Sequence, residues 1–259
     1  TVISQQTIDI LFNEPVEQLL YLASEFIEDS RDYNIEQEKL SESFKIFKST
    51  KAFNYTERYS KDVNSKIYPL DALAANTLTL ALQKYGQNER SLFSFLEATD
   101  HTSLNRFRRV DSDFYNLANV YDYLNFNFYT YLTSQYNKDF QFWASIKAAL
   151  DSVEREFDSN IHDASKLVKT IGLLNIFAPS GSNLGNQFLI DYATTCLNIR
   201  KPGELIEKLS QKQIIWYRKH SKRYIPFEGT DLNIQSALIE AGNKVSLGTD
   251  IVTLIKRYC

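Results

Sequence analysis

The sequence predicts a mainly α fold: a bundle of helices followed by a small unit of three helices and a β-hairpin. With only eight Gly and five Pro in 259 residues, the chain has few of the turn-forming residues that a fold of many short strands requires. Apolar side chains recur every three or four positions over most of the chain before residue 212, which is typical of amphipathic helices. Two short runs of strand-forming residues, 214–217 and 223–227, then flank a polar turn, which predicts the hairpin.

The composition is that of an ordinary globular protein, because 43% of the residues are apolar and 24% are charged. The longest apolar runs, such as residues 171–177, are far shorter than the roughly 20 residues of a membrane-spanning helix, so no membrane partner is expected. No leader with a charged and then an apolar part begins the chain, which predicts a cytoplasmic location. Cys196 and Cys259 lack the spacing of a disulfide framework or a zinc site. The chain contains no Met, and we expect it to be a fragment of a longer protein.

The first helices are expected within residues 1–64. Apolar residues over 7–29 follow a three-to-four spacing, and Pro15 is expected to divide this helix into two pieces. Residues 35–48 repeat the pattern among many charges, which predicts a second and more exposed helix.

Residues 65–162 are expected to form a helical domain. Its first helix is expected to include Leu70 and Tyr85 and to end at Gly86, the residue type favoured just after a helix. A second helix is predicted at 89–98. The aromatic-rich residues 113–157 predict two or three packed helices, whose rings are interpreted as core in preference to a stacking surface for bases or cofactors.

Residues 163–230 change in character. Asp163 is expected to cap a first helix, and a second is predicted at 186–197. A third, at 202–211, begins with Pro and has Glu204 close to its positive end, both favourable placements. Three short helices and a hairpin are the arrangement of a winged helix. The predicted organisation is therefore an N-terminal helical segment 1–64, a helical domain 65–162, a winged-helix-like domain 163–230 and the start of a following segment 231–259.

The sequence contains no complete catalytic site. A nucleotide hydrolase needs a GxxxxGK[ST] loop and an acidic residue for magnesium, and neither can be found. The Gly cluster at residues 181–186 lacks the Lys of that loop and is interpreted as a linker between helices, with phosphate binding as the alternative. The histidines His101, His162 and His220 are far apart in sequence, and no Ser lies in a GxSxG turn. A free-standing hydrolase is therefore not expected.

Arg90 is a candidate phosphate contact, because it would project from the first turn of the helix that directly follows Gly86. A guanidinium held there keeps its charge and can present two donors to a phosphate oxygen. The alternative is a surface Arg paired with Glu89 or Glu97, and the local sequence leaves both interpretations open.

Positive charge is concentrated between residues 200 and 223, where eight Lys or Arg stand against two Glu in a chain of formal net charge −3. A basic patch on an acidic body indicates a localised anionic partner. Cations on a narrow hairpin can reach a phosphate backbone, with helix 202–211 as the candidate recognition helix. The alternative is a solvated hairpin in a winged helix that packs only against its own neighbours. The candidate nucleic-acid contacts are Lys208, Lys212, Arg218, Lys219, Lys222 and Arg223.

Several blocks of the sequence resemble a known family. Tyr68-Pro69-Leu70 begins a helix-rich block that ends in YGQNERSLFSFL at residues 85–96. It is similar to the lid region of large prokaryotic P-loop ATPases of the AAA/STAND kind, including ones associated with phage defence. KTIGLLN at 169–175, YRKHSKRY at 217–224 and FEGTDLNI at 227–234 are similar to later blocks of the same proteins.

The resemblance implies a C-terminal lid and winged-helix region that follows a nucleotide-binding domain. In the family's lid, a Gly-x-x-x-Arg turn resembles the sensor-2 position, whose Arg contacts the terminal phosphate of ATP, and this role falls on Arg90. The upstream domain would hold ATP and Mg, and neither is expected in this chain alone, which lacks the phosphate loop. The implied function is regulatory, with ATP state controlling the binding of double-stranded DNA by the winged helix.

A second function remains open from the residues. The chain would then be a helical protein-interaction scaffold with a purely structural winged helix, and residues 113–157 would dock a protein partner or a second copy.

Overall fold

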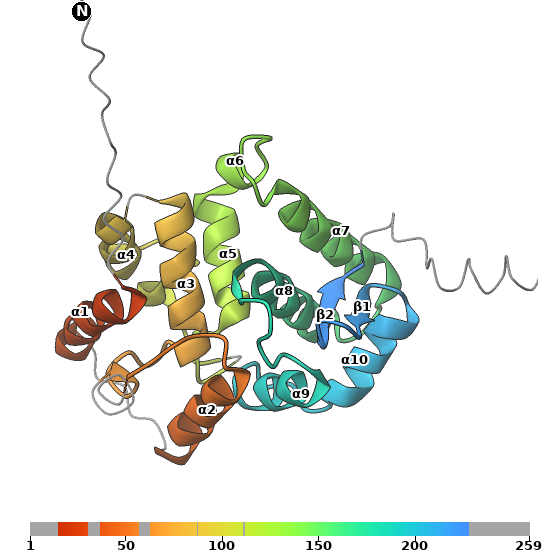
Figure 1. Ribbon diagram of the computed structural model, residues 1–259, viewed down its shortest axis with the longest axis horizontal. Helices are drawn as coiled ribbons and strands as arrows, with labels where there is room; N and C mark the ends of the chain where they lie inside the picture. The colour runs from red at the N-terminus through yellow and green to blue at the C-terminus, as the bar shows by residue number, and fades with distance from the viewer. Residues whose placement is uncertain (1–14, 31–36, 57–62, 87, 111, 228–259) are drawn as a thin grey trace, which may run out of the picture. The chain divides into compact units, whose positions relative to one another are not determined.

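A computed structural model of the protein describes residues 15–30, 37–56, 63–86, 88–110 and 112–227. Within these residues the chain forms ten α-helices, one short 3-10 helix and a two-stranded antiparallel sheet, which confirms the predicted mainly α class (Figure 1). In chain order the elements are α1 (Val16–Ser30), α2 (Gln37–Thr50), α3 (Ala72–Tyr85), α4 (Asn88–Glu97), η2 (Leu104–Arg106), α5 (Leu117–Asn127), α6 (Tyr129–Leu132), α7 (Phe140–Glu156), α8 (Ile161–Phe177), α9 (Asn186–Thr195), α10 (Pro202–Gln211), β1 (Ile215–Arg218) and β2 (Arg223–Pro226).

Helix α3 is buried on almost every side. Its small residues, such as Ala74 and Ala75, are at most 1% exposed, and small side chains let neighbouring helices approach closely. The helix contacts α1, α2, α4, α5 and α8. Asp71 caps its N-terminus, because Oδ1 of Asp71 accepts hydrogen bonds from the backbone N–H groups of Leu73 and Ala74. Gly86 directly follows the helix, as predicted.

Helices α5, α7 and α8 form the second part of the core, in which α8 packs against both of the others. Gly172 on α8 lies so close to α7 that a Cβ added there would be 2.6 Å from Cδ1 of Ile146. Nearly all of the buried apolar residues among the described ones belong to a single cluster that extends from Leu19 to Ile215. Helices on both sides of residue 163, where a domain boundary is predicted, therefore share one core.

The start of α8 differs from the prediction. The sequence indicates Asp163 as its N-cap, but the helix begins at Ile161, and Asn160 occupies the cap position. Asn160 has φ 63°, a left-handed conformation that Asn tolerates better than most residues. Asp163 lies instead in the first turn, where a negative charge is favourable beside the helix N-terminus.

Most other predicted helices are found within two residues of their expected ends. Residues 113–157 contain three helices, α5, α6 and α7, and the helix predicted at 202–211 is α10. The short η2, within the stretch from 98 to 116 that separates α4 from α5, has no counterpart in the prediction.

The hairpin follows α8, α9 and α10 in the predicted order. Its strands pair in antiparallel register, with Trp216 opposite Ile225 and Arg218 opposite Arg223. Strand β1 contacts α10, and β2 contacts α8 and α7. Ile215 and Ile225 are at most 2% exposed, so one face of the hairpin joins the core.

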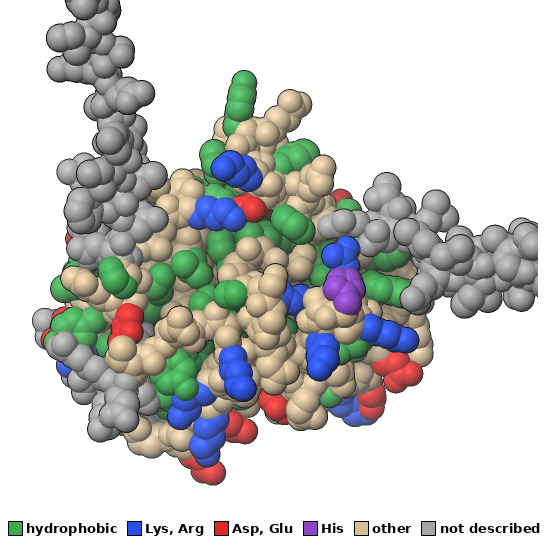
Figure 2. Space-filling model, viewed as in Figure 1, with side chains coloured by type: hydrophobic (Ala, Val, Ile, Leu, Met, Phe, Trp, Pro, Cys, Tyr) green, Lys and Arg blue, Asp and Glu red, His purple; other side chains and the backbone are tan. Residues whose placement is uncertain are grey.

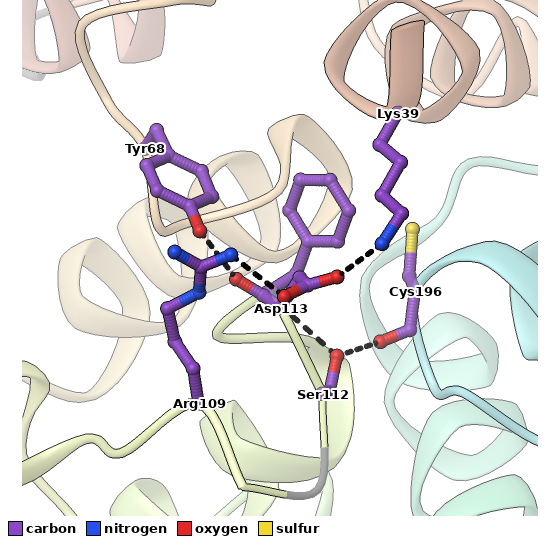
Figure 3. A network of polar contacts seen from close by, with 7 residues as sticks. Lys39, Tyr68, Arg109, Ser112, Asp113 and Cys196 are labelled. Carbon is purple, nitrogen blue, oxygen red and sulfur yellow. Dashed lines mark hydrogen bonds and ion pairs between the residues drawn. The ribbon is translucent and has the colours of Figure 1, made fainter. Parts of the chain in front are cut away.

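The segment just before α5 connects distant parts of the chain. Asp113 forms ion pairs with Nζ of Lys39 on α2, at 2.8 Å, and with Nη2 of Arg109, at 2.7 Å (Figure 3). The hydrogen bonds from Lys39 and then Arg109 hold the pKa of the Asp113 carboxyl below its usual range. Ser112 Oγ donates a hydrogen bond of 2.6 Å to the carbonyl of Cys196, just after α9. These contacts fix the segment against both α2 and α9.

Three of the predictions fall wholly or partly outside the described residues. Pro15 directly precedes α1, so the first part of the helix predicted at 7–29 is outside them, as are the following segment 231–259 and most of the FEGTDLNI block. Within the described residues, none of the helices combines the length and the apolar character needed to cross a membrane.

Candidate nucleic-acid interface

Two of the four cations of the hairpin are exposed, and both lie at its tip. Lys219 and Lys222 are exposed in the turn between the strands, and Arg218 is half-buried at the end of β1. Within the described part of the chain, the ion pairs do not include Lys219 or Lys222. Figure 2 shows Lys and Arg side chains and a histidine gathered over this region. In the part of the chain that the structure describes, two lysines of the hairpin turn therefore face solvent without a carboxylate partner.

Arg223 lies in a different environment from the other hairpin cations. It is only 7% exposed, and its Nη1 and Nη2 donate hydrogen bonds to the carbonyls of Ala178, at 3.3 Å, and Pro179, at 2.7 Å. Burial lowers the pKa of its guanidinium. The sequence predicts Arg223 as a nucleic-acid contact, whereas in the structure its donors hold the hairpin to the loop after α8.

The two predicted nucleic-acid contacts near the end of α10, Lys208 and Lys212, also differ in their surroundings. Lys208 is exposed on the helix, whereas Nζ of Lys212 forms an ion pair of 3.0 Å with Glu156 on α7. Both members of that pair are solvated, so the pair is weak and the lysine can be drawn away by a stronger anion. Lys208 therefore presents its charge more freely than Lys212.

Aromatic side chains lie beside the hairpin cations. Trp216 is 42% exposed and Tyr217 is 36% exposed, although large aromatic side chains are usually buried more deeply. Tyr217 packs edge to face on Tyr224 with ring centroids 5.0 Å apart, and Tyr224 Oη donates to Asn186 Oδ1 at 3.2 Å. The hairpin thus combines solvent-facing rings with two ammonium groups that form no ion pair within the described residues.

Arg90 falls in the first turn of α4, as the sequence predicts. Its side chain lies outside the described part of the chain, so its proposed contact with phosphate stays a prediction.

The aromatic residues of 113–157 divide into two groups. Several are buried as predicted, among them Phe114, Tyr115, Tyr121 and Tyr123. Others face solvent around α6 and the ends of α5 and α7, and Tyr136 is 91% exposed. The exposed rings are those of Phe126, Tyr129, Tyr131, Tyr136, Phe140 and Phe142.

A cationic cavity lies away from the hairpin, between the segment around η2 and helices α5 and α8. His101 and His162, which are distant in sequence, both line it. The signal for it in the sequence is the spacing of His162, Lys166 and Lys169, which places the three residues on one face of a helix. Such a spacing occurs on many solvated helix faces, so by itself it does not predict a site.

The Gly cluster at 181–186 is a packed connection between α8 and α9. The backbone N–H of Asn183 donates to the carbonyl of Thr50 at 2.7 Å, and Gly185 stands at the N-cap of α9. These contacts agree with its interpretation as a linker.

Among the described residues, no group of three or more His, Cys, Asp or Glu side chains is placed to hold a metal ion. Comparisons with protein-family models, with curated proteins and with solved structures find no match to this chain.

Proposed function

We propose that this chain is a regulatory and partner-binding region of a larger P-loop ATPase and that it binds double-stranded DNA through the hairpin. The observation that carries the DNA proposal is the combination of Lys219 and Lys222, without ion pairs in the described residues, with the exposed rings of Trp216 and Tyr217. Cations that contact phosphates release counterions, which supplies most of the sequence-independent affinity for DNA.

We further propose that residues 163–230 are a winged helix. The order of α8, α9, α10 and the hairpin supports this arrangement, as do the contacts of α10 with α9 and β1. The wing would be the main DNA contact, because the exposed face of α10 carries Glu204 and Glu207 as well as Lys208. Those carboxylates would face phosphates of the same charge.

Anisotropy of a labelled 20-base-pair duplex tests the interface. In the double variant Lys219→Gln/Lys222→Gln, affinity should fall, and the slope of log K against log salt should become shallower by about 2, since each lost phosphate contact removes about 0.9. A matched double variant, Lys45→Gln/Lys147→Gln, removes two exposed lysines from α2 and α7 and should bind like the wild type. An unchanged slope in the hairpin variant would refute the DNA contact.

The ATPase part of the proposal concerns Arg90. A lid that supplies a cation to the terminal phosphate of ATP closes only while that phosphate is present, so nucleotide state would set the position of the winged helix. ATP and Mg would be bound by an upstream domain, and the parent protein would act in phage defence.

This part is tested in the full-length parent protein. Arg90→Ala should lower ATP hydrolysis and should remove any dependence of DNA affinity on ATP. Normal hydrolysis and undiminished ATP dependence in the variant would contradict the role of Arg90.

The exposed rings around α6 favour a second candidate function, a helical scaffold that docks a protein partner or a second copy. Sedimentation of the chain over a range of concentrations tests self-association. Tyr131→Ser/Tyr136→Ser should shift any dimer towards monomer. A wild-type chain that sediments as a monomer at all concentrations would rule out self-association.

A further inference from the structure

Two adjoining cavities lie between the segment around η2 and helices α5 and α8. One has a volume of about 600 Å³ and the other of about 350 Å³, within or close to the range of small-ligand sites. They share four lining residues, so they lie side by side and are treated below as the two ends of one paired cavity. The shared residues are His101, Phe107, Asn119 and Asp122.

The smaller cavity is cationic. Arg106 and Arg108 line it from the segment around η2, and Lys166 and Lys169 line it from α8. The carboxylate in its lining is that of Asp122, which pairs with Lys169 Nζ at 2.6 Å. Positive charge therefore exceeds negative charge, which favours an anion.

Lys166 is the strongest indication of an anionic ligand. The residue is 9% exposed, yet its Nζ reaches only the carbonyl of Leu197, at 3.4 Å, and Oδ1 of Asp163, at 3.9 Å, within the described part of the chain. An ammonium group has three donors, and a buried charge without good acceptors is costly. An anion in the cavity would supply the missing acceptors.

The larger cavity is lined mainly by rings and neutral polar groups. His101 and Phe126 pack edge to face with ring centroids 4.7 Å apart, and Phe107 and Tyr129 add further rings. Asn119 Oδ1 accepts a hydrogen bond from the backbone of Asn116, and its amide nitrogen, which has no acceptor among the described residues, can donate to a ligand. Flat apolar surfaces beside an amide suit a planar heterocycle that carries hydrogen-bonding groups.

We propose that the paired cavity binds a nucleoside diphosphate, with the phosphates among Arg106, Arg108, Lys166 and Lys169 and the base among the rings of the larger end. A simple anion would leave the aromatic end unfilled, and an uncharged heterocycle would leave Lys166 without acceptors. The lining of this site includes no residue of the hairpin, and the proposal rests neither on the hairpin nor on the phosphate contact proposed for Arg90.

Calorimetric titration of the 259-residue chain with ADP, GDP, CDP and UDP tests the proposal. At least one of them should bind with one-to-one stoichiometry and at least about tenfold more tightly than either its nucleoside or inorganic pyrophosphate, because each fills only one end. No saturable binding of any nucleoside diphosphate, or equal affinity for pyrophosphate, would overturn the site.

Variants at the two ends of the cavity should show separately how the phosphates and the nucleoside contribute to binding. Arg108→Gln, at an exposed position, should weaken binding of the diphosphate about tenfold and leave the nucleoside unchanged. Phe126→Ala, at a side chain 53% exposed, should weaken the nucleoside and the diphosphate about tenfold and leave pyrophosphate unchanged. Lys147→Gln and Tyr136→Ala are the matched controls outside the lining, and both should bind normally.

Lys166→Met distinguishes a ligand contact from a purely structural lysine. Replacing a poorly paired buried cation by an apolar chain should keep or raise the melting temperature while it weakens diphosphate binding by about tenfold or more. A variant that binds normally would overturn the role of Lys166. Loss of binding in Arg90→Gln together with normal binding in Arg108→Gln would place the ligand at α4 and overturn the proposed site.

Discussion

The side chain of Asp71 is buried, and its carboxylate accepts three hydrogen bonds. Its carboxylate accepts from the backbone of Leu73 and Ala74 and, at 2.7 Å, from Tyr192 Oη. Burial outweighs these bonds and raises the pKa of Asp71 to about 6. The same residue thus caps α3 and joins it to α9. Its burial destabilises the charged form of the carboxylate.

The raised pKa makes a pH-dependent contribution to stability. The folded state holds the Asp71 proton more tightly than the unfolded state, so this contribution is complete below the ordinary pKa near 3.8 and is lost as pH rises through about 6. Asp71→Asn keeps an acceptor for the α3 N-terminus and cannot titrate. The stability of the wild type relative to this variant should therefore fall by about 2 to 3 kcal/mol between pH 4 and pH 7.

Urea unfolding of both chains at intervals across this range measures that difference, in which the titration of all other groups cancels. A difference that stays constant with pH would show that Asp71 has an ordinary pKa in the folded chain.

The environment of a single cation could not be predicted from the hairpin sequence. Lys222 and Arg223 are neighbours in the same basic run, but Lys222 faces solvent and Arg223 is buried against the carbonyls of Ala178 and Pro179. The direction of each side chain depends on the strand register and on the loop after α8, and neither is encoded within the run itself.

At the scale of elements, sequence patterns located the long helices and missed the irregular connections. Helices such as α3 and α10 carry their own start and end signals, including Gly86 after α3 and Pro202 at the start of α10. Residues 98–116 have no comparable periodicity. The conformation of this segment depends instead on tertiary hydrogen bonds such as that of Ser112 to Cys196. This is also the segment that supplies one wall of the cationic cavity.

The close approach of α7 and α8 depends on a glycine. A methyl group at Gly172 would overlap the buried side chain of Ile146, whereas one at Gly203 on α10 would meet only Cδ1 of Ile190, at 4.0 Å. Gly172→Ala should therefore destabilise the fold by about 1 to 3 kcal/mol, even though Ala favours the helix. Gly203→Ala should stabilise it by up to about 1 kcal/mol.

Urea unfolding of both variants and the wild type measures these two opposite changes in the free energy of unfolding. Equal stabilisation in both would mean that α7 and α8 lie further apart than the structure indicates.

At the scale of the molecule, the candidate sites differ in how readily they can be predicted from the sequence. The hairpin patch is contiguous, so its charge could be counted along residues 200–223. The cationic cavity joins Arg106 and Arg108 to Lys166 and Lys169 from a helix some 60 residues later, and they meet only in the folded chain. Local patterns reveal a site of the first kind and cannot reveal one of the second.

The single shared core also predicts which shortened forms of the chain can fold. Helix α8 contacts α3, α5 and α7, and these neighbours are lost in a chain of residues 163–227. That chain should retain helical far-ultraviolet circular dichroism but lack near-ultraviolet signal, and it should bind a hydrophobic dye, because the core side of α8 becomes exposed. Residues 15–227 should instead unfold in one transition that coincides for both signals. A cooperative transition of 163–227 alone would show that the winged-helix-like region is an independent domain and that its packing on α5 and α7 is not needed for folding.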